Sequence, residues 1–157
     1  MSRFATGVTV VTVEAGARTF GMTANAFMAG SLEPPLCVIS IGRAAKMHAH
    51  VQVAGWFGVS FLSEGQAELA QHFAARPIAT VAPRFRRVGG VPVLEGCVGA
   101  VAARVVGNAE CGDHTLFLGL VEELVAEDHE PLLFYAGRYA GLDREQRLEK
   151  LATHSFW

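Results

Sequence analysis

The feature that most constrains the fold of this chain is a series of short apolar and β-branched runs separated by turns. Val8–Val13 is β-branched at every position and predicts a strand, and Glu14–Ala17 predicts the turn of a hairpin. The Pro34–Pro35 pair cannot lie inside a helix or a central strand, so it marks where another strand begins. The expected strands are Val8–Val13, Arg18–Thr23, Leu36–Ile41, Trp56–Leu62, Gly96–Val106, Thr115–Ala126, Leu132–Tyr135 and Arg138–Ala140.

Two further segments have the pattern of helices. Ala44–Val53 predicts a short helix. Ser63 predicts the N-cap of a second helix, Glu64–Ala75, which has acidic and amide side chains in its first turn and apolar residues three and four apart. Residues 76–95 contain three prolines and predict irregular structure.

This order of elements predicts a mainly β domain. Many short strands without a regular βαβ alternation favour a barrel or a sandwich with accessory helices. The absence of GxGxxG and GxxxxGK[ST] leaves a Rossmann or P-loop interpretation without support. The length of 157 residues predicts one domain over 1–157, in which 143–157 form a C-terminal tail whose first part, 143–150, is charged and helix-prone.

The composition indicates more apolar surface than a small monomer can hide. Apolar residues make up 51% of the chain and charged residues 18%, where about 25% charged is usual. We therefore expect part of the apolar surface to be buried against a second copy of the chain.

The charge pattern excludes several partners and locations. With a net charge of −2, the largest basic cluster is Arg84, Arg86 and Arg87, which predicts a solvated loop and no nucleic-acid partner. No apolar run approaches 18 residues, so no membrane span is expected. Since the N-terminus lacks the pattern of a signal peptide, we expect a cytoplasmic protein.

The cysteines and histidines do not form the pattern of a metal or hydrolase site. The three cysteines, Cys37, Cys97 and Cys111, are widely spaced without a CxxC and predict small buried thiols. His48 and His50 are two residues apart and therefore lie on different faces of a helix. GxSxG is absent. We expect no metal and no nucleophilic residue.

Three stretches are unusual enough to be candidate binding sites. Gly21–Asn25 (GMTAN) is a polar break whose amides and Asn side chain suit the edge of a planar heterocycle, or simply satisfy a turn. Arg43–Lys46 opens a helix and could bind a phosphate, although by itself the segment favours a solvated helix start. Gly112–His114 forms a turn, and its His could point into a cleft.

Together these segments resemble the flavin reductase family, the FMN-binding split-barrel proteins that reduce flavin with NAD(P)H. The resemblance covers about residues 4–142. It is carried, in order, by Phe4–Thr12 (FATGVTVVT), Gly21–Phe27 (GMTANAF) with Ser31 and Pro34–Leu36 (PPL), Phe57–Ala74 (FGVSFLSEGQAELAQHFA), Gly112–His114 (GDH) and Leu132–Tyr139 (LLFYAGRY).

The resemblance implies a six-stranded split β-barrel that works as a homodimer, with flavin near the subunit interface. It also implies hydride transfer from NADH or NADPH to FMN or FAD, with reduced flavin diffusing to a partner monooxygenase. The residues that match the family's binding segments are Thr23, Ala24 and Asn25 at the isoalloxazine edge, Ser40 and Ile41 near the ribityl chain, Lys46 at the phosphate and His114 at the nicotinamide.

The chain departs from the family pattern at three places. Ala44, Ala45 and Met47 stand where family members usually carry Ser or Thr in the phosphate segment, which removes hydroxyl donors. Ser60 stands where Asn is usual. The family ordinarily has a helix before the FATG segment, and here only three residues precede it, which implies a truncated helix or a misassigned start.

Other functions remain open from the residues alone. Flavin carries its own reactive centre, so a reductase needs no nucleophile or general base and only has to hold two rings together. A flavin-binding carrier or sensor on the same fold is the main alternative. A pyridoxamine-phosphate-oxidase-like enzyme would need a substrate-binding Arg and His pattern that is not evident here. A purely structural domain is the third alternative.

Overall fold

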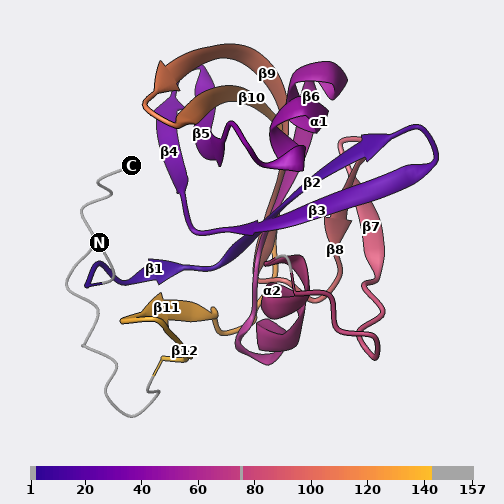
Figure 1. The fold of residues 1–157 in the computed structure, drawn as a ribbon, viewed down its shortest axis with the longest axis vertical. Helices are drawn as coiled ribbons and strands as arrows, with labels where there is room; N and C mark the ends of the chain where they lie inside the picture. The colour runs from indigo at the N-terminus through magenta and orange to yellow at the C-terminus, as the bar shows by residue number, and fades with distance from the viewer. Residues whose placement is uncertain (1–2, 75, 143–157) are drawn as a thin grey trace.

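In the computed structural model of the protein, which describes residues 3–74 and 76–142, seven antiparallel strands form the main sheet (Figure 1). Their order across the sheet is β3-β2-β6-β9-β10-β5-β4. The strands are β2 (Thr9–Ala15), β3 (Arg18–Ala24), β4 (Phe27–Leu32), β5 (Pro35–Gly42), β6 (Trp56–Phe61), β9 (Gly99–Cys111) and β10 (His114–Ala126). The expected mainly β class is confirmed.

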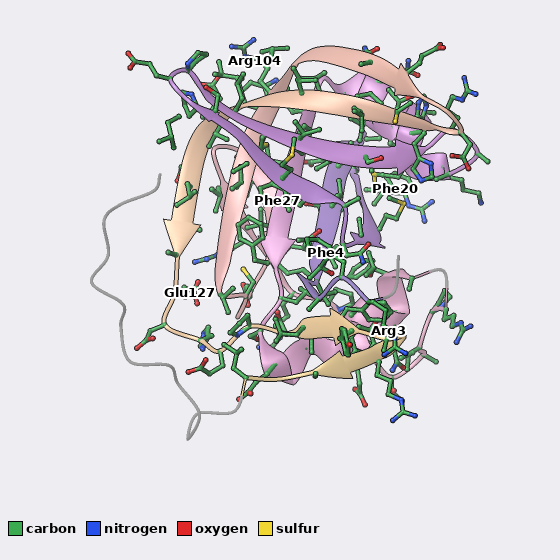
Figure 2. The ribbon with its side chains drawn as sticks, turned by 90° about the vertical axis from the view of Figure 1, so that its left-hand side faces the viewer. Arg3, Phe4, Phe20, Phe27, Arg104 and Glu127 are labelled. Atoms are coloured by element: carbon green, nitrogen blue, oxygen red, sulfur yellow. The ribbon has the colours of Figure 1, made fainter. Side chains whose placement is uncertain are left out.

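The two edges of this sheet lie next to each other in the chain. β3 and β4 are at opposite edges, yet only residues 25 and 26 separate them. The sheet must therefore curl until its edges meet at this connection. Phe27 of β4 packs edge-on against Phe61 of β6, with 4.9 Å between ring centroids, and lies inside the curl (Figure 2). The hydrogen-bonded order is open and has seven strands, so the expected six-stranded barrel is not confirmed by the strand pairing.

The β-branched run on β2 is explained by burial on both faces. Val11 and Val13 belong to the main core, together with Met47 and Val51 of α1 (Lys46–Ala54). Val10 points the other way, into a second core beneath α2 (Ala67–Phe73). Because successive side chains of a strand alternate between faces, a core on each side buries both faces of β2, and the Thr9 and Thr12 hydroxyls each donate to a carbonyl.

Smaller elements close the ends of the main sheet. The β7–β8 hairpin, Phe85–Val88 and Val91–Leu94, packs on β2 and β6, where Thr12 Oγ1 donates to the Pro92 carbonyl. A separate sheet joins β1 (Thr6–Gly7), β11 (Leu133–Tyr135) and β12 (Arg138–Ala140). Figure 1 shows this sheet and the β7–β8 hairpin on opposite sides of α2.

Several local expectations are confirmed. β5 begins at Pro35, and β11 and β12 lie where short final strands are expected. Ser63 caps the next helical segment through a capping box with Gln66. That segment divides into a 3₁₀ turn, Glu64–Gln66, and α2, so the expected single helix is shorter and interrupted. Among the described residues, no helix is long and apolar enough to cross a membrane.

Other expectations are wrong because distant segments determine the structure. Residues 76–95 are not irregular throughout, since they contain the β7–β8 hairpin. Arg86 and Arg87 lie on β7 and form ion pairs with Glu127 and Glu14, so the basic cluster is not a solvated loop. The expected connection 107–114 is mostly strand, and β9 and β10 are joined only by Gly112 and Asp113.

Two remaining expectations concern β4 and the cysteines. β4, which the sequence interpretation lacked, occupies a sheet edge. Cys37 and Cys97 are buried as expected, but Cys111 is exposed at the end of β9. The tail expected at 143–157 lies outside the described residues.

Candidate functional site

Two cavities lie along the edge strand β3 and are lined by successive residues of it. The smaller has a volume of about 190 Å³ and the larger about 430 Å³. The smaller is lined by Val8, Thr23, Ala24, Asn25, Ala74, Phe134 and Tyr139. The larger is lined by Phe20, Gly21, Met22, Ala45, Lys46, Met47, His50 and Phe73.

β3 can border both cavities because, among the described residues, it is paired on one side only, by β2, and is covered by α2. A Cβ on Gly21 would lie 2.5 Å from Cε1 of Phe73, so only glycine lets this ring approach the strand. Thr23 Oγ1 donates to the Ala70 carbonyl over 2.7 Å, which ties β3 to α2 two residues further on. The Gly-x-Thr spacing thus places Gly21 and the Thr23 side chain on the α2 face of the strand.

The segment Thr23–Asn25 is fixed from both ends. Thr9 Oγ1 donates to the Ala24 carbonyl over 2.6 Å, and the Ser40 amide donates to the Ala26 carbonyl over 3.1 Å. The main chain turns here between the two edges of the sheet, which leaves Asn25 exposed. The smaller cavity therefore has a rigid polar border on β3 and an aromatic wall, in which Phe134 and Tyr139 pack edge-on.

The larger cavity receives its positive charge from the start of α1. Lys46 is the first residue of α1 and lines the cavity. The N-cap residue is Ala45, which offers no side-chain hydrogen bond to the first helical turn. The Ala-for-Ser/Thr departures thus leave the first amides of α1 and the Lys46 ammonium as the groups that favour an anion at this place.

The Gly112–Asp113 turn holds a histidine beside the loop that leads to α1. Nδ1 of His114 donates to Oδ1 of Asp113 over 2.8 Å, because an ionised carboxylate can only accept. This hydrogen bond, more than the charge of the imidazole, lowers the pKa of the Asp113 carboxyl. Nε2 of His114 faces Gly42 at the end of β5, where a Cβ on the glycine would lie 3.6 Å from it. The Arg43 amide donates to the Asp113 carbonyl over 2.9 Å, which joins the two loops.

The structure brings together some of the residues singled out from the sequence and separates others. Thr23, Ala24 and Asn25 line the smaller cavity, and Lys46 lines the larger one. Ile41 is fully buried in the main core, so only its main chain is available to a ligand. Ser40 lies beside the 25–26 connection, and His114 lies near the Arg43–Lys46 loop; neither lines the two cavities.

Sequence reasoning missed five aromatic side chains that line the cavities, Phe20, His50, Phe73, Phe134 and Tyr139. Phe134 and Tyr139 lie in Leu132–Tyr139, a segment that carries the family resemblance but for which no binding role was predicted. Phe20 lies within a predicted strand and His50 within a predicted helix, and neither belongs to a motif that indicates a binding site. No local pattern marks Phe20 and His50 as site residues, since their role depends on β3 and α1 lying side by side.

The site consists of two cavities with mainly apolar walls and has few chemically reactive side chains. Among residues 3–74 and 76–142, no group of three His, Cys, Asp or Glu side chains could hold a metal ion. Burial raises the pKa of the Cys37 thiol to about 11, so this thiol stays protonated at neutral pH. Largely apolar cavities with a single ammonium suit a planar ring system with an anionic tail.

Known proteins share this fold and much of this sequence. The family model described as "flavin reductase like domain" matches residues 1–143. An NADH-dependent flavin reductase of a Rhodococcus species is 42% identical over 146 residues, which cover 91% of this chain and 83% of the relative. The reductase component of 4-hydroxyphenylacetate 3-monooxygenase from Thermus thermophilus is 40% identical, covering 90% of this chain and 92% of the relative.

Solved structures give the same result. The structure of the flavin reductase PheA2 in its native state superimposes with a TM-score of 0.89 at 41% identity, covering 92% of this chain and 94% of the other. The flavin reductase of styrene monooxygenase from Pseudomonas putida has a TM-score of 0.85 at 35% identity, covering 90% and 93%.

Proposed function

Because the chain belongs to the flavin reductase family, we propose that it transfers hydride from NADH to FMN or FAD and supplies the reduced flavin to a flavin-dependent monooxygenase. The observation that carries this proposal is the pair of cavities along β3, bordered by Thr23–Asn25 at one end and Lys46 at the other. The names of the relatives support an oxidoreductase that uses NADH.

The residues present fit a flavin. The smaller cavity has apolar and aromatic walls for a ring system, with the polar edge of Thr23–Asn25 beside it. Lys46 and the start of α1 would hold the phosphate. Ser40 and the main chain of Ile41 would border the ribityl chain from β5, and His114 would place the nicotinamide.

In this reaction the role of the protein is to position the flavin and the nicotinamide. A bound flavin supplies the redox centre that accepts the hydride. The described residues would hold the ring system on β3, anchor its anionic tail and exclude water with the Phe134–Tyr139 wall. Such positioning lowers the barrier by aligning two reactants, without a protein group that gains or loses a proton.

The direct test is steady-state oxidation of NADH by the purified protein, followed at 340 nm with FMN, FAD or no added flavin. We expect oxidation that depends on flavin and is much slower with riboflavin, which lacks the phosphate that Lys46 would bind. Tight stoichiometric flavin with negligible turnover would instead favour a carrier or sensor. No oxidation with any flavin, and no flavin binding by fluorescence, would contradict the proposal.

Replacing His114 by alanine is expected to raise the KM for NADH roughly tenfold and to leave the flavin Kd within about twofold. The reason is the loss of one hydrogen bond to the nicotinamide, about 1.4 kcal/mol. Steady-state kinetics and flavin fluorescence titration measure the two quantities. Cys111→Ala is the matched control, because Cys111 is exposed and is the cross-strand partner of His114. An equal loss of NADH and flavin affinity would make His114 a structural residue.

We also infer that the curled sheet is the split barrel of the family and that the protein is a homodimer. The outer face of β4, β5 and β10 carries six apolar side chains, Met28, Leu36, Val38, Leu116, Leu118 and Leu120. β4, β5 and the first eight residues of β10 contain no Asp, Glu, Lys or Arg. An uncharged face that ends in an uncharged edge strand is typical of a surface that a second subunit covers.

A further inference from the structure

A hydrogen bond between α1 and β10 involves a side chain that the proposed flavin site does not use. Nε2 of His48, the third residue of α1, lies 2.8 Å from Oγ1 of Thr115 on β10. Because a hydroxyl group can both donate and accept, either neutral tautomer of His48 makes this hydrogen bond. The imidazole also packs edge-on against Phe117 of β10, with 5.3 Å between ring centroids. The His48 ring is therefore held on β10 by one polar and one aromatic contact.

Lys46 and His48 lie on different sides of α1. Two residues correspond to a rotation of roughly 200° around a helix. Lys46 and His50 line the larger cavity beside β3, whereas His48 lines neither cavity and is hydrogen-bonded to β10. The two histidines are thus on different faces of the helix, as their spacing predicts. His48 can therefore affect a ligand at Lys46 only through the position of the helix.

Few other polar contacts fix the first turn of α1. Its N-cap residue makes no side-chain hydrogen bond, and within residues 3–74 and 76–142 no α1 side chain except His48 forms one. Met47 and Val51 hold α1 against the main core, and His50 stacks on Phe20 on the cavity side. Apolar contacts are non-directional, whereas a hydrogen bond restricts both distance and angle. The rotation of α1 about its axis thus depends on the His48–Thr115 hydrogen bond.

We propose that His48 is a positioning residue of the flavin site, whose hydrogen bond to Thr115 fixes the rotation of α1 that places the Lys46 ammonium at the flavin phosphate. This inference rests on the proposed function, in which Lys46 binds that phosphate. Thr115 is a firm anchor, because its side chain is buried and β10 is paired on both sides, by β5 and β9. Without the hydrogen bond α1 stays packed on the core, but Lys46 loses its alignment with the anion.

The choice of flavin separates a positioning role from a structural one. Riboflavin has the ring system and the ribityl chain of FMN but no phosphate. A displacement of Lys46 therefore weakens the binding of FMN and leaves that of riboflavin unchanged. A general loosening of the protein would weaken both flavins by the same factor.

The test measures the Kd of FMN and of riboflavin for the full chain by flavin fluorescence titration, without NADH. We expect His48→Ala to weaken FMN about fivefold, the typical effect of one hydrogen bond, and to keep the riboflavin Kd within about twofold. Thr115→Val removes only the hydroxyl group and should have the same effect. His48→Gln should restore FMN binding, because its amide nitrogen can take the place of Nε2. In a Lys46→Ala background, His48→Ala should cause no further loss of FMN affinity.

Val53→Ala is the matched control and should leave both dissociation constants unchanged, since Val53 is on α1 and 87% exposed. Equal losses of FMN and riboflavin affinity in His48→Ala and Thr115→Val would overturn the inference and make the pair structural. So would an unchanged FMN Kd in both variants, or a further loss when His48→Ala is added to Lys46→Ala. Equal binding of FMN and riboflavin by the unchanged protein would also overturn it, because Lys46 would then bind no phosphate. If no flavin binds at all, the proposed function itself fails, and the inference fails with it.

Discussion

Replacing Leu118 by glutamate is expected to convert the proposed homodimer into monomers. Leu118 lies within the uncharged outer face of β4, β5 and β10, directly across from Val38 in the strand register. Val38 in turn pairs with Met28 of the edge strand. The substitution therefore places a carboxylate in the middle of a continuous apolar surface.

The expected effect is large because a two-fold interface contains the residue twice. In a symmetric dimer both copies of residue 118 enter the same interface, so two carboxylates would be desolvated within it. Each uncompensated buried charge costs several kcal/mol. Since about 1.4 kcal/mol is a factor of ten in the dissociation constant, that constant should rise by roughly a thousandfold or more.

Sedimentation velocity at several protein concentrations measures this change. The matched control is Leu124→Glu, the same substitution on the same strand at a side chain that is 62% exposed and outside the face. It should leave the dimer intact. A Leu118→Glu protein that remains dimeric would place the interface elsewhere, and an unchanged protein that is monomeric at micromolar concentration would contradict the homodimer.

Replacing Phe57 by alanine is expected to lower the free energy of unfolding by about 3–5 kcal/mol, the cost of removing a large buried aromatic side chain. The Phe57 side chain is fully buried in the main core. A Cβ on Gly119 would lie 2.5 Å from its Cζ atom, so the ring packs directly against the main chain of β10. Because strands on both sides hold this backbone, the sheet cannot close the cavity that the substitution leaves.

Urea unfolding followed by circular dichroism, at one fixed protein concentration, measures this free energy. Phe57→Leu keeps the protein measurable if the alanine variant does not fold, and it should lose less. Val53→Ala on the exposed side of α1 should change the free energy by no more than about 0.5 kcal/mol. A loss below about 1 kcal/mol for Phe57→Ala would show that the core is not packed around this ring.

Local patterns in the sequence predicted the secondary structure correctly where the backbone preferences of the segment's own residues determine it. The β-branched run predicted β2, Pro35 predicted the start of β5, and Ser63 predicted a capped helical segment. Each of these signals depends on backbone preferences of the residues themselves. The motifs at Gly21–Asn25 and Arg43–Lys46 likewise led to residues that line the two cavities.

Local patterns did not predict the secondary structure where pairing with a segment distant in the sequence determines it. β4 has the sequence FMAGSL, which lacks strand alternation, and it is a strand because β5 pairs with it. The β7–β8 hairpin contains a proline at position 92 and is held by hydrogen bonds from Thr12 to Pro92 and from Leu94 to Ser60. Ser60, where the family usually has Asn, thus has a buried structural role.

The sequence by itself determined the mainly β class, the family and the segments that border the site, because these depend on local preferences and on short motifs in order. Only the tertiary structure decided that β3 and β4 are opposite edges of one curled sheet, joined by residues 25 and 26. It also decided that Phe20, His50 and Lys46 share a cavity. The physical reason is that a cavity is made by the packing of elements distant in sequence, which no periodicity within one element records.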